Sequence, residues 1–301
     1  MAMVAVVAAG CKNGGTTSNG AAEPGIEAGE PYLGLASALA HNTPEEWAAN
    51  HVALGLKSIV FPVDCNAGEE KIQAYKKAAD DAGLMIAEVG VWRNTLAKDP
   101  QERQKWIDYA VEQLKMADRI GAVCCVNVVG TPYGPRWDGA YKENFSAELW
   151  DMAVKMIQEI IDRAQPKNAK YCIEPMPWMI PSTPEECLKL VEDVDRPQFG
   201  VHMDIVNIIT SPEKYFFNDK FLDDCFALLG DKICSCHLKD IRLKEEFTFQ
   251  LEECACGEGT LDIARYIKLA TSVNPKMPMI IEHLNSDEQY IKTLQYVQSL
   301  Q

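Results

Sequence analysis

The sequence has little positive charge and no long apolar segment. Its 301 residues include 29 Lys and Arg against 44 Asp and Glu, which gives a formal net charge of −15. A surface this negative repels phosphate backbones and anionic lipids, so nucleic acids and charged membranes are poor partners. No run of 18 apolar residues occurs, so no segment is expected to cross a membrane as a helix. These absences favour a small neutral or metal-bridged substrate.

The chain also lacks the signs of a disulfide framework. Its eleven cysteines are scattered, and several lie inside apolar runs such as AVCCVNVV at residues 122–129. Cysteines in such runs are typical of small buried hydrophobic residues. We therefore expect them to contribute to packing.

Basic residues are also missing from the start of the chain. MAMVAVVAAGCKNGG is a short apolar run that ends in Ala-Ala-Gly-Cys and resembles a bacterial lipobox, in which Cys11 would carry a lipid anchor. A Gly-, Ser-, Thr- and Ala-rich stretch follows, as in a flexible tether. Signal peptides start with basic residues, whereas residues 1–10 have none, so a truncated signal and an unrelated tail both stay open. We expect residues 1–29 to be a lipobox-like signal remnant and tether. The protein would then face the periplasm at the cell envelope, and it would be cytoplasmic without a lipobox.

From residue 30 onward, short apolar runs alternate with longer amphipathic segments. The runs are apolar on both faces, as in a parallel sheet covered by helices. The amphipathic segments repeat apolar residues every three or four positions, and two of them open with Thr-Pro-Glu-Glu, a helix-capping pattern. The predicted strands cover residues 32–37, 56–61, 84–90, 122–129, 170–174, 199–204, 232–238 and 277–284.

Eight strand–helix units predict a single-domain (β/α)8 TIM barrel over residues 30–301. A doubly wound open sheet is the alternative. Such sheets usually carry a Gly-rich phosphate turn after the first strand, and neither GxGxxG nor GxxxxGK occurs here. The missing motif favours the barrel.

Barrels of this kind place functional side chains at the C-terminal ends of their strands. The last four predicted strands end in Glu174, Asp204, His237 and Glu282. Neighbouring strands lie about 4.8 Å apart, so these four ends can converge on one ion. Charged residues also occur at strand ends because the adjoining loops are exposed to solvent. Glu174 and Glu282, however, close buried apolar runs, where an unpaired carboxylate costs free energy. Three carboxylates and one imidazole favour Mn²⁺, with Mg²⁺, Co²⁺ or Zn²⁺ as alternatives.

The stretch KICSCHLKD at residues 232–240 raises the question of a thiolate site. Side chains alternate along a strand, so Ser235, His237 and Lys239 share one face. Cys234 and Cys236 share the other. With His237 directed into the barrel, both cysteines are predicted to pack against the helical layer.

Five motifs carry a family resemblance. YCIEPMPWM, FGVHMDIVN, CSCHLKD, GEGTLD and MIIEHL follow one another in the order found in the xylose-isomerase-like TIM barrels, which the chain resembles over about residues 30–301. That superfamily contains sugar isomerases and epimerases, inosose dehydratases, C-glycoside deglycosidase subunits and AP endonucleases. The resemblance implies that Glu174, Asp204, His237 and Glu282 bind one divalent metal. It also implies that Glu174 and Glu282 exchange protons with the substrate from opposite faces.

Further residues near these strand ends are candidates for catalysis or substrate binding. His202 shares a barrel face with Asp204 and is either a catalytic base or a support. Lys239 shares the face of His237 and is either a catalytic group that stabilises negative charge or a solvated loop lysine. Candidate substrate-binding residues lie in loops on the same rim, and the aromatic ones can stack on a sugar or an aglycone. They are Asn207, Trp92, Trp178 and Glu258, with Trp137 in the loop after the fourth strand.

Three functions fit these residues. The first is a metal-dependent isomerase or epimerase that removes an α-proton from a keto-sugar through a metal-stabilised enediolate. The second is a lyase that uses the same proton abstraction to cleave a 3-oxo-glycoside by β-elimination, as the deglycosidase resemblance implies. The third is a non-catalytic sugar-binding lipoprotein. AP endonuclease activity is disfavoured, because three zinc ions need more histidines than the five present and the net charge repels DNA. A homo-oligomer or a second subunit stays open.

Overall fold

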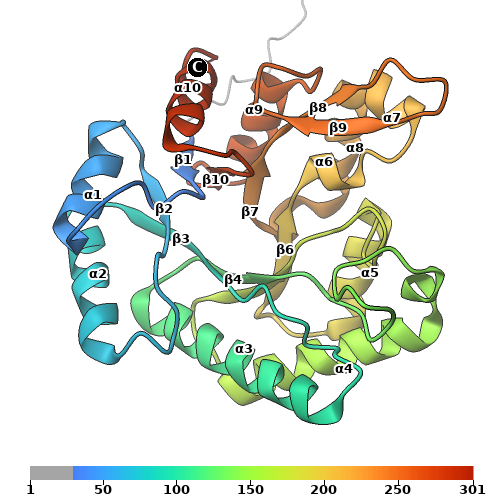
Figure 1. Cartoon of the computed structure of the whole chain (residues 1–301), viewed down its shortest axis with the longest axis horizontal. Helices are drawn as coiled ribbons and strands as arrows, with labels where there is room; N and C mark the ends of the chain where they lie inside the picture. The colour runs from blue at the N-terminus through green and yellow to red at the C-terminus, as the bar shows by residue number, and fades with distance from the viewer. Residues whose placement is uncertain (1–29, 301) are drawn as a thin grey trace, which may run out of the picture.

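Eight parallel strands form the centre of the molecule, and helices surround them (Figure 1). The structure is a computed structural model that describes residues 30–300, so the predicted lipobox and tether lie outside the described residues. The strands are hydrogen-bonded in the order β1-β10-β7-β6-β5-β4-β3-β2. Their bounds are β1 Tyr32–Leu35, β2 Ser58–Val60, β3 Met85–Gly90, β4 Cys124–Asn127, β5 Lys170–Ile173, β6 Phe199–Met203, β7 Ile233–Leu238 and β10 Pro278–Ile281. Each falls within a predicted run, which confirms the (β/α)8 barrel.

The first and second strands meet where the sheet closes on itself. The Lys57 amide donates to the Leu33 carbonyl over 3.2 Å, and the Ser58 hydroxyl donates to the Tyr32 carbonyl over 2.7 Å. Gly34 makes this approach sterically feasible. A Cβ at that position would lie 2.6 Å from Ile280 Cδ1 and 2.9 Å from the Ser58 carbonyl oxygen. Glycine at position 34 therefore lets β1 fill the seam between β10 and β2.

The helices begin where the sequence provides caps. Thr43 accepts a hydrogen bond from Glu46 N, Thr183 from Glu186 N, and Ser146 from Leu149 N, which satisfies amides of the first turns. No helix of residues 30–300 is long and apolar enough to span a membrane. The α-helices are α1 Pro44–Ala53, α2 Glu69–Asp81, α3 Pro100–Ile120, α4 Ala147–Ala164, α5 Pro184–Val194, α6 Ile205–Ile208, α7 Pro212–Phe216, α8 Asn218–Leu229, α9 Ile263–Val273 and α10 Asp287–Gln298. Two 3₁₀ turns cover Lys142–Phe145 and Gly230–Lys232.

One element was not predicted from the sequence. After β7 the chain forms an antiparallel hairpin of β8 Asp240–Leu243 and β9 Leu251–Cys254, which is separate from the barrel sheet. The residues of β9 are partly or fully exposed, so the strand lacks the buried apolar face that reveals a strand in a sequence. The hairpin lies beside α7 and α8 (Figure 1), and its residue Glu253 reaches the cavity at the ends of the barrel strands.

The two cysteines of β7 do not share a face, which corrects the prediction for Cys234. Val201 pairs with Ile233, but the next residue of β6, His202, pairs with Ser235. Cys234 is therefore the extra residue of a bulge. It packs against Cys124, Val126 and Cys172 inside the barrel, whereas Cys236 packs in the outer core as predicted.

Asp240 fixes the loop between the hairpin and α9. Its buried carboxylate accepts hydrogen bonds from the amides of Gly257, Gly259, Leu261 and Ile241 over 2.8–3.0 Å. An anionic acceptor shared by several buried amides is a strong local constraint. The loop conformation therefore depends on this one side chain.

Replacing Asp240 by alanine should leave these amides without an acceptor. We expect Asp240→Ala to lower the free energy of unfolding by about 3 kcal/mol, measured by urea denaturation. Asp231→Ala is the matched control, because Asp231 is exposed and pairs with its neighbour Lys232. It should change stability by less than about 0.5 kcal/mol. Equal effects of the two substitutions would contradict the role assigned to Asp240.

Candidate functional site

Four predicted metal ligands meet at the mouth of the barrel. Glu174, Asp204 and Glu282 are the first residues after β5, β6 and β10, and His237 lies near the end of β7. These four strands are consecutive neighbours in the sheet. One ligand atom from each residue lies within 4.8 Å of all the others, and all four side chains are buried. The structure therefore brings together the set that the sequence predicted.

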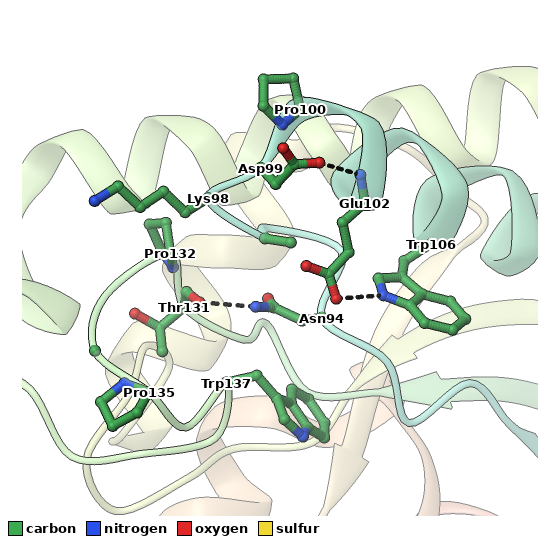
Figure 2. Close-up of a pocket in the computed structure, with 12 residues that line it drawn as sticks. Asn94, Lys98, Asp99, Pro100, Glu102, Trp106, Thr131, Pro132, Pro135 and Trp137 are labelled. Carbon is green, nitrogen blue, oxygen red and sulfur yellow. Dashed lines mark hydrogen bonds between the residues drawn. The ribbon is translucent and has the colours of Figure 1, made fainter.

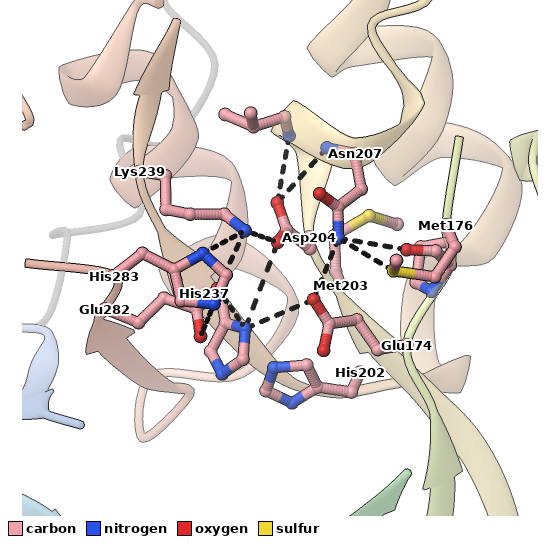
Figure 3. A network of polar contacts seen from close by, with 12 residues as sticks. Glu174, Met176, His202, Met203, Asp204, Asn207, His237, Lys239, Glu282 and His283 are labelled. Atoms are coloured by element: carbon pink, nitrogen blue, oxygen red, sulfur yellow. Dashed lines mark hydrogen bonds and ion pairs between the residues drawn. The ribbon is translucent and has the colours of Figure 1, made fainter. Parts of the chain in front are cut away.

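The imidazole of His237 stands at the centre of this set (Figure 3). Its Nδ1 lies 2.9 Å from Glu282 Oε1, 3.5 Å from Glu174 Oε1 and 3.9 Å from Asp204 Oδ2. Asp204 uses its other oxygen to cap α6, where it accepts from the amides of Val206 and Asn207. Each of the four residues thus directs one ligand atom to a common centre.

Several of these atoms lack a hydrogen-bond partner. His237 Nδ1, Asp204 Oδ2 and Glu282 Oε1 are buried and make no hydrogen bond with protein groups of residues 30–300. Buried polar atoms without partners are costly, and a divalent cation compensates such a set. Oxygen and imidazole donors suit Mg²⁺, Mn²⁺ or Co²⁺. The residues present therefore fit one divalent ion.

Lys239 supplies a positive charge beside the same oxygens. Its Nζ lies 2.5 Å from Asp204 Oδ2 and 2.8 Å from Glu282 Oε1. These approaches lie off hydrogen-bonding directions, so charge attraction joins the groups. Burial lowers the pKa of the Lys239 ammonium, but the two carboxylates outweigh burial and hold it well above its usual value. Lys239 is thus a buried cation of the site rather than a solvated loop lysine.

Glu174 and Glu282 differ in their electrostatic surroundings. Burial raises the pKa of Glu174 to about 7, although His237 opposes this shift. Burial also acts to raise the pKa of Glu282, but His237 and Lys239 outweigh it and leave this pKa well below its ordinary value. Environments that separate two carboxyl pKa values produce one proton donor and one acceptor. The pair can therefore transfer a proton in each direction.

His202 lies beneath the site and does not line its cavity. Its ring contacts the ring of His237 edge to face with 3.9 Å between centroids, and its Nδ1 is hydrogen-bonded to Ser235 Oγ. Burial, followed by the proximity of His237, lowers its pKa well below the usual value, so the ring is neutral. Of the two roles expected for His202, the geometry matches the supporting one. A catalytic base would have to face the substrate.

Glu88 supports the same imidazole from the other side. Its Oε1 lies 3.6 Å from His237 Nε2, and its Oε2 lies 3.5 Å from His202 Nδ1. A carboxylate behind a ligating histidine orients the ring and raises its basicity. Glu88 lies near the end of the third predicted strand, but this position alone does not distinguish a support for the imidazole from a metal ligand.

A cavity of about 580 Å³ opens above the cluster. Glu174, His237 and Glu282 line its floor, and Asn207 lines its side. Asn207 donates from Nδ2 to Glu174 Oε1 over 2.9 Å, so it holds this carboxylate in place (Figure 3). The predicted substrate-binding residues Trp92 and Trp178 line the cavity together with Trp137. This floor of charged groups and wall of indole rings suits a hydroxylated ligand.

Glu258 lies outside this cavity, which corrects its predicted place. Its carboxylate faces Lys292 of α10 at 3.7 Å and lines a separate cavity. The amides on both sides of it, at Gly257 and Gly259, bind Asp240, and this turns the side chain away. Glu253 of β9 lines the central cavity instead and lies 3.3 Å from Lys239 Nζ. Sequence reasoning missed Glu253 because it missed the hairpin.

His283 is a second residue that was not expected at the site. It lines the cavity next to Glu282, and its Nδ1 lies 2.9 Å from Glu253 Oε1 and 3.4 Å from Lys239 Nζ. The hydrogen bond to Glu253 raises the pKa of His283. The hairpin therefore joins the charged floor of the cavity through Glu253.

Comparisons with known proteins agree with this fold. No curated protein matches the chain. A xylose isomerase-like TIM barrel protein from Mycobacterium smegmatis, solved with magnesium, has a TM-score of 0.64 at 17% identity and covers 85% of this chain and 87% of its own. D-psicose 3-epimerase from Clostridium cellulolyticum H10, solved with D-tagatose, has a TM-score of 0.67 at 12% identity over 89% and 97%. The 3-keto-D-glucoside 4-epimerase from E. coli has a TM-score of 0.64 at 14% identity over 90% and 100%.

Structures this distant in sequence establish a shared fold and no more. The family itself is established by the sequence. A family model described as the xylose isomerase-like TIM barrel matches residues 49–300. With most of its length matched, this chain belongs to the xylose isomerase-like TIM barrel family.

Proposed function

We propose that the protein is a divalent-metal-dependent sugar isomerase or epimerase that acts on a keto-sugar. The observation that carries this proposal is the pair Glu174 and Glu282, two buried carboxyls that line a cavity with tryptophan walls. They belong to a cluster that fits one metal ion. Sugar epimerases among the proteins of the same fold support the proposal.

Glu174, Asp204, His237 and Glu282 would hold the ion. We propose Mn²⁺, with Mg²⁺, Co²⁺ or Zn²⁺ as alternatives, because the donors are mostly hard oxygens. When bound, the ion supplies positive charge that polarises the sugar carbonyl and favours negative charge on its oxygen. Glu88 and His202 keep the His237 ring in the orientation this requires.

The two glutamates carry the proton transfers. Glu282, ionised at neutral pH, takes the proton from the carbon next to the carbonyl. The electrons of the broken C–H bond form a C=C bond, and the carbonyl electrons move onto oxygen to give an enediolate. Glu174 takes up a proton from solvent on the carboxylate oxygen that does not hold the ion and delivers it to the opposite face. Return to the opposite face inverts the carbon, and the reverse reaction uses the two groups in exchanged roles.

Lys239 stabilises charge during these steps. Its ammonium is fixed by Asp204, Glu282 and Glu253, so it needs no reorganisation when negative charge develops nearby. A preorganised cation in a buried site is an effective source of transition-state stabilisation.

The imidazole of His283, which lines the cavity, also favours a second candidate, the β-elimination of a 3-oxo-glycoside. In that reaction the α C–H bond breaks, a C=C bond forms, and the C–O bond to the aglycone breaks with its electron pair leaving on oxygen. The departing oxygen needs a proton, and His283, whose pKa is raised by its hydrogen bond to Glu253, is a donor at the cavity. Release of free aglycone distinguishes this lyase from an epimerase.

Product analysis tests the proposal directly. The protein with Mn²⁺ is incubated with ketohexoses and with 3-oxo-glucosides, and epimers and aglycones are quantified by chromatography. We expect epimerisation of a keto-sugar, with uptake of deuterium at the α-carbon in D₂O. Glu282→Gln should lower kcat by about 10²- to 10⁴-fold, because it removes the base.

Glu258→Gln is the matched control for this experiment. Glu258 lies outside the cavity, so its substitution should change kcat less than about twofold. Bound metal is measured in both variants, since Glu282 is also a ligand. Sugar binding without turnover by a metal-loaded wild-type protein would favour the non-catalytic alternative. Aglycone release without epimerisation would favour the lyase.

Metal affinity should depend on pH. Burial holds the pKa of Glu174 at about 7, so its carboxyl is protonated below that pH and must lose this proton to bind an ion. The affinity for Mn²⁺ should therefore fall by at least about tenfold for each pH unit below 7. Burial lowers the pKa of His237, but Glu282 and Glu174 outweigh burial and hold it well above its usual value, so His237 must also release a proton and the affinity should keep rising above pH 7. Isothermal titration calorimetry between pH 5.5 and 8 measures the dissociation constant. Repeating the titrations in buffers of different ionisation enthalpy gives the number of protons released on binding. A dissociation constant unchanged between pH 5.5 and 7 would contradict the pKa assigned to Glu174.

A further inference from the structure

A second cavity adjoins the central one at Trp137. Its volume is about 740 Å³, and it lies between the loop after β3 and the loop after β4. Trp137 is the residue that lines both cavities. Each volume alone falls in the usual range of small-molecule sites, about 300–1,000 Å³. Two ligand-sized spaces thus meet at one indole ring.

The loop that carries Trp137 is fixed on both sides. On one side, Asn94 Nδ2 donates to the Thr131 carbonyl over 2.8 Å (Figure 2). Gly130, with a φ of 78°, permits this approach, because a Cβ there would lie 2.5 Å from Asn94 Oδ1. On the other side, Trp178 Nε1 donates to the Asp138 carbonyl over 2.7 Å. Trp137 is therefore held in place where the two spaces adjoin.

The polar groups of the second cavity suit a neutral hydroxylated ligand. Glu102 and Asp99 outnumber Lys98, so the cavity does not favour an anion such as a phosphate. Glu102 Oε1 accepts from Trp106 Nε1 over 3.3 Å, which fixes the carboxylate. No hydrogen bond of residues 30–300 engages Glu102 Oε2. This oxygen can accept from a sugar hydroxyl.

The apolar surfaces of the cavity match the remaining faces of a sugar ring. Pro100, Pro132 and Pro135 form rigid apolar walls, and Trp137 lies at the base (Figure 2). The Trp106 ring already carries cations, with Arg93 at 5.2 Å and Lys105 at 4.4 Å from its centroid. Trp137 is therefore the indole available to pack against the C–H face of a ligand.

We propose that the second cavity binds a sugar unit joined by a glycosidic bond to the keto-sugar ring in the central cavity. The substrate is then a glycoside of two sugar units rather than a free monosaccharide. This inference rests on the proposed function, because the central ring is the one that reacts. It assigns Glu102 and Trp137 to substrate recognition. Neither residue takes part in the proton transfers at the floor of the central cavity.

Paired substrates test the second cavity. The 3-oxo forms of methyl β-glucoside and of cellobiose are compared with Mn²⁺ by steady-state kinetics. We expect a KM about tenfold lower for the cellobiose derivative, from one hydrogen bond to a carboxylate and one aromatic contact. Glu102→Ala should remove most of this difference by raising the KM of the cellobiose derivative alone. Trp92→Ala should raise both KM values, since Trp92 lines only the central cavity.

Glu112→Ala is the matched control on the same helix. Glu112 is exposed and pairs with Lys115 away from the cavity, so both KM values should be unchanged. Equal effects of Glu102→Ala on the two substrates, or no effect on either, would overturn the proposal. The assignment to a sugar would be overturned if the 3-oxo form of phenyl β-glucoside had a lower KM than the methyl β-glucoside derivative while the cellobiose derivative did not.

Calorimetry separates this inference from the proposed function. If no compound is turned over, the proposed function fails. In that case, the dissociation constants of cellobiose and methyl β-glucoside are measured by calorimetry. Tighter binding of cellobiose to the wild-type protein, lost in Glu102→Ala, would still support the second cavity. Turnover of both 3-oxo compounds with equal KM would retain the function and reject the second sugar unit.

Discussion

The structure depends on the burial of three carboxylates around one imidazole. Glu174, Asp204 and Glu282 each place an oxygen near His237 Nδ1 in a region with little solvent access. Like charges this close repel each other strongly at low dielectric, so their burial requires compensating positive charge. Lys239 and the His237 ring provide part of it, and a proton on Glu174 relieves more at or below neutral pH. A divalent ion would replace that proton, so the affinity for metal would depend on the same electrostatic balance.

The barrel supplies this arrangement by geometry. Strands β5, β6, β7 and β10 are consecutive in the sheet, so one residue at the end of each is enough to surround an ion. Beneath it, Glu88, His202 and Ser235 hold the imidazole through contacts from three strands. The hairpin β8–β9 adds Glu253 from outside the barrel sheet. Each layer constrains the one above it, and of the three supporting residues Glu88 also lines the cavity.

The sequence predicted those parts of the molecule that rest on regular patterns. Apolar runs located all eight barrel strands, and strand ends located Glu174, Asp204, His237 and Glu282. The predictions were wrong where the chain departs from the regular alternation of strand residues or lacks a buried face. The bulge at Cys234 breaks the alternation from which its direction was inferred. The hairpin has no buried face, so Glu253 stayed hidden, and the turn of Glu258 away from the cavity depends on amides that bind Asp240. Such features follow from tertiary contacts, which no local pattern records.

The division between floor and walls indicates where substrate choice resides. The floor is fixed by electrostatics, and any change among its charged groups alters the balance of the whole cluster. The walls come from loops after β3, β4 and β5, which carry Trp92, Trp137 and Trp178. The Asn94 and Trp178 side chains hold these loops together by donating to the Thr131 and Asp138 carbonyls. None of these contacts involves the floor, so the other side chains of the loops can vary without disturbing it. Proteins that share the four ligands can therefore share proton chemistry and still differ in the glycoside they accept. For this chain, we expect the residues that decide that choice to lie between 92 and 102, between 131 and 138, and at Trp178.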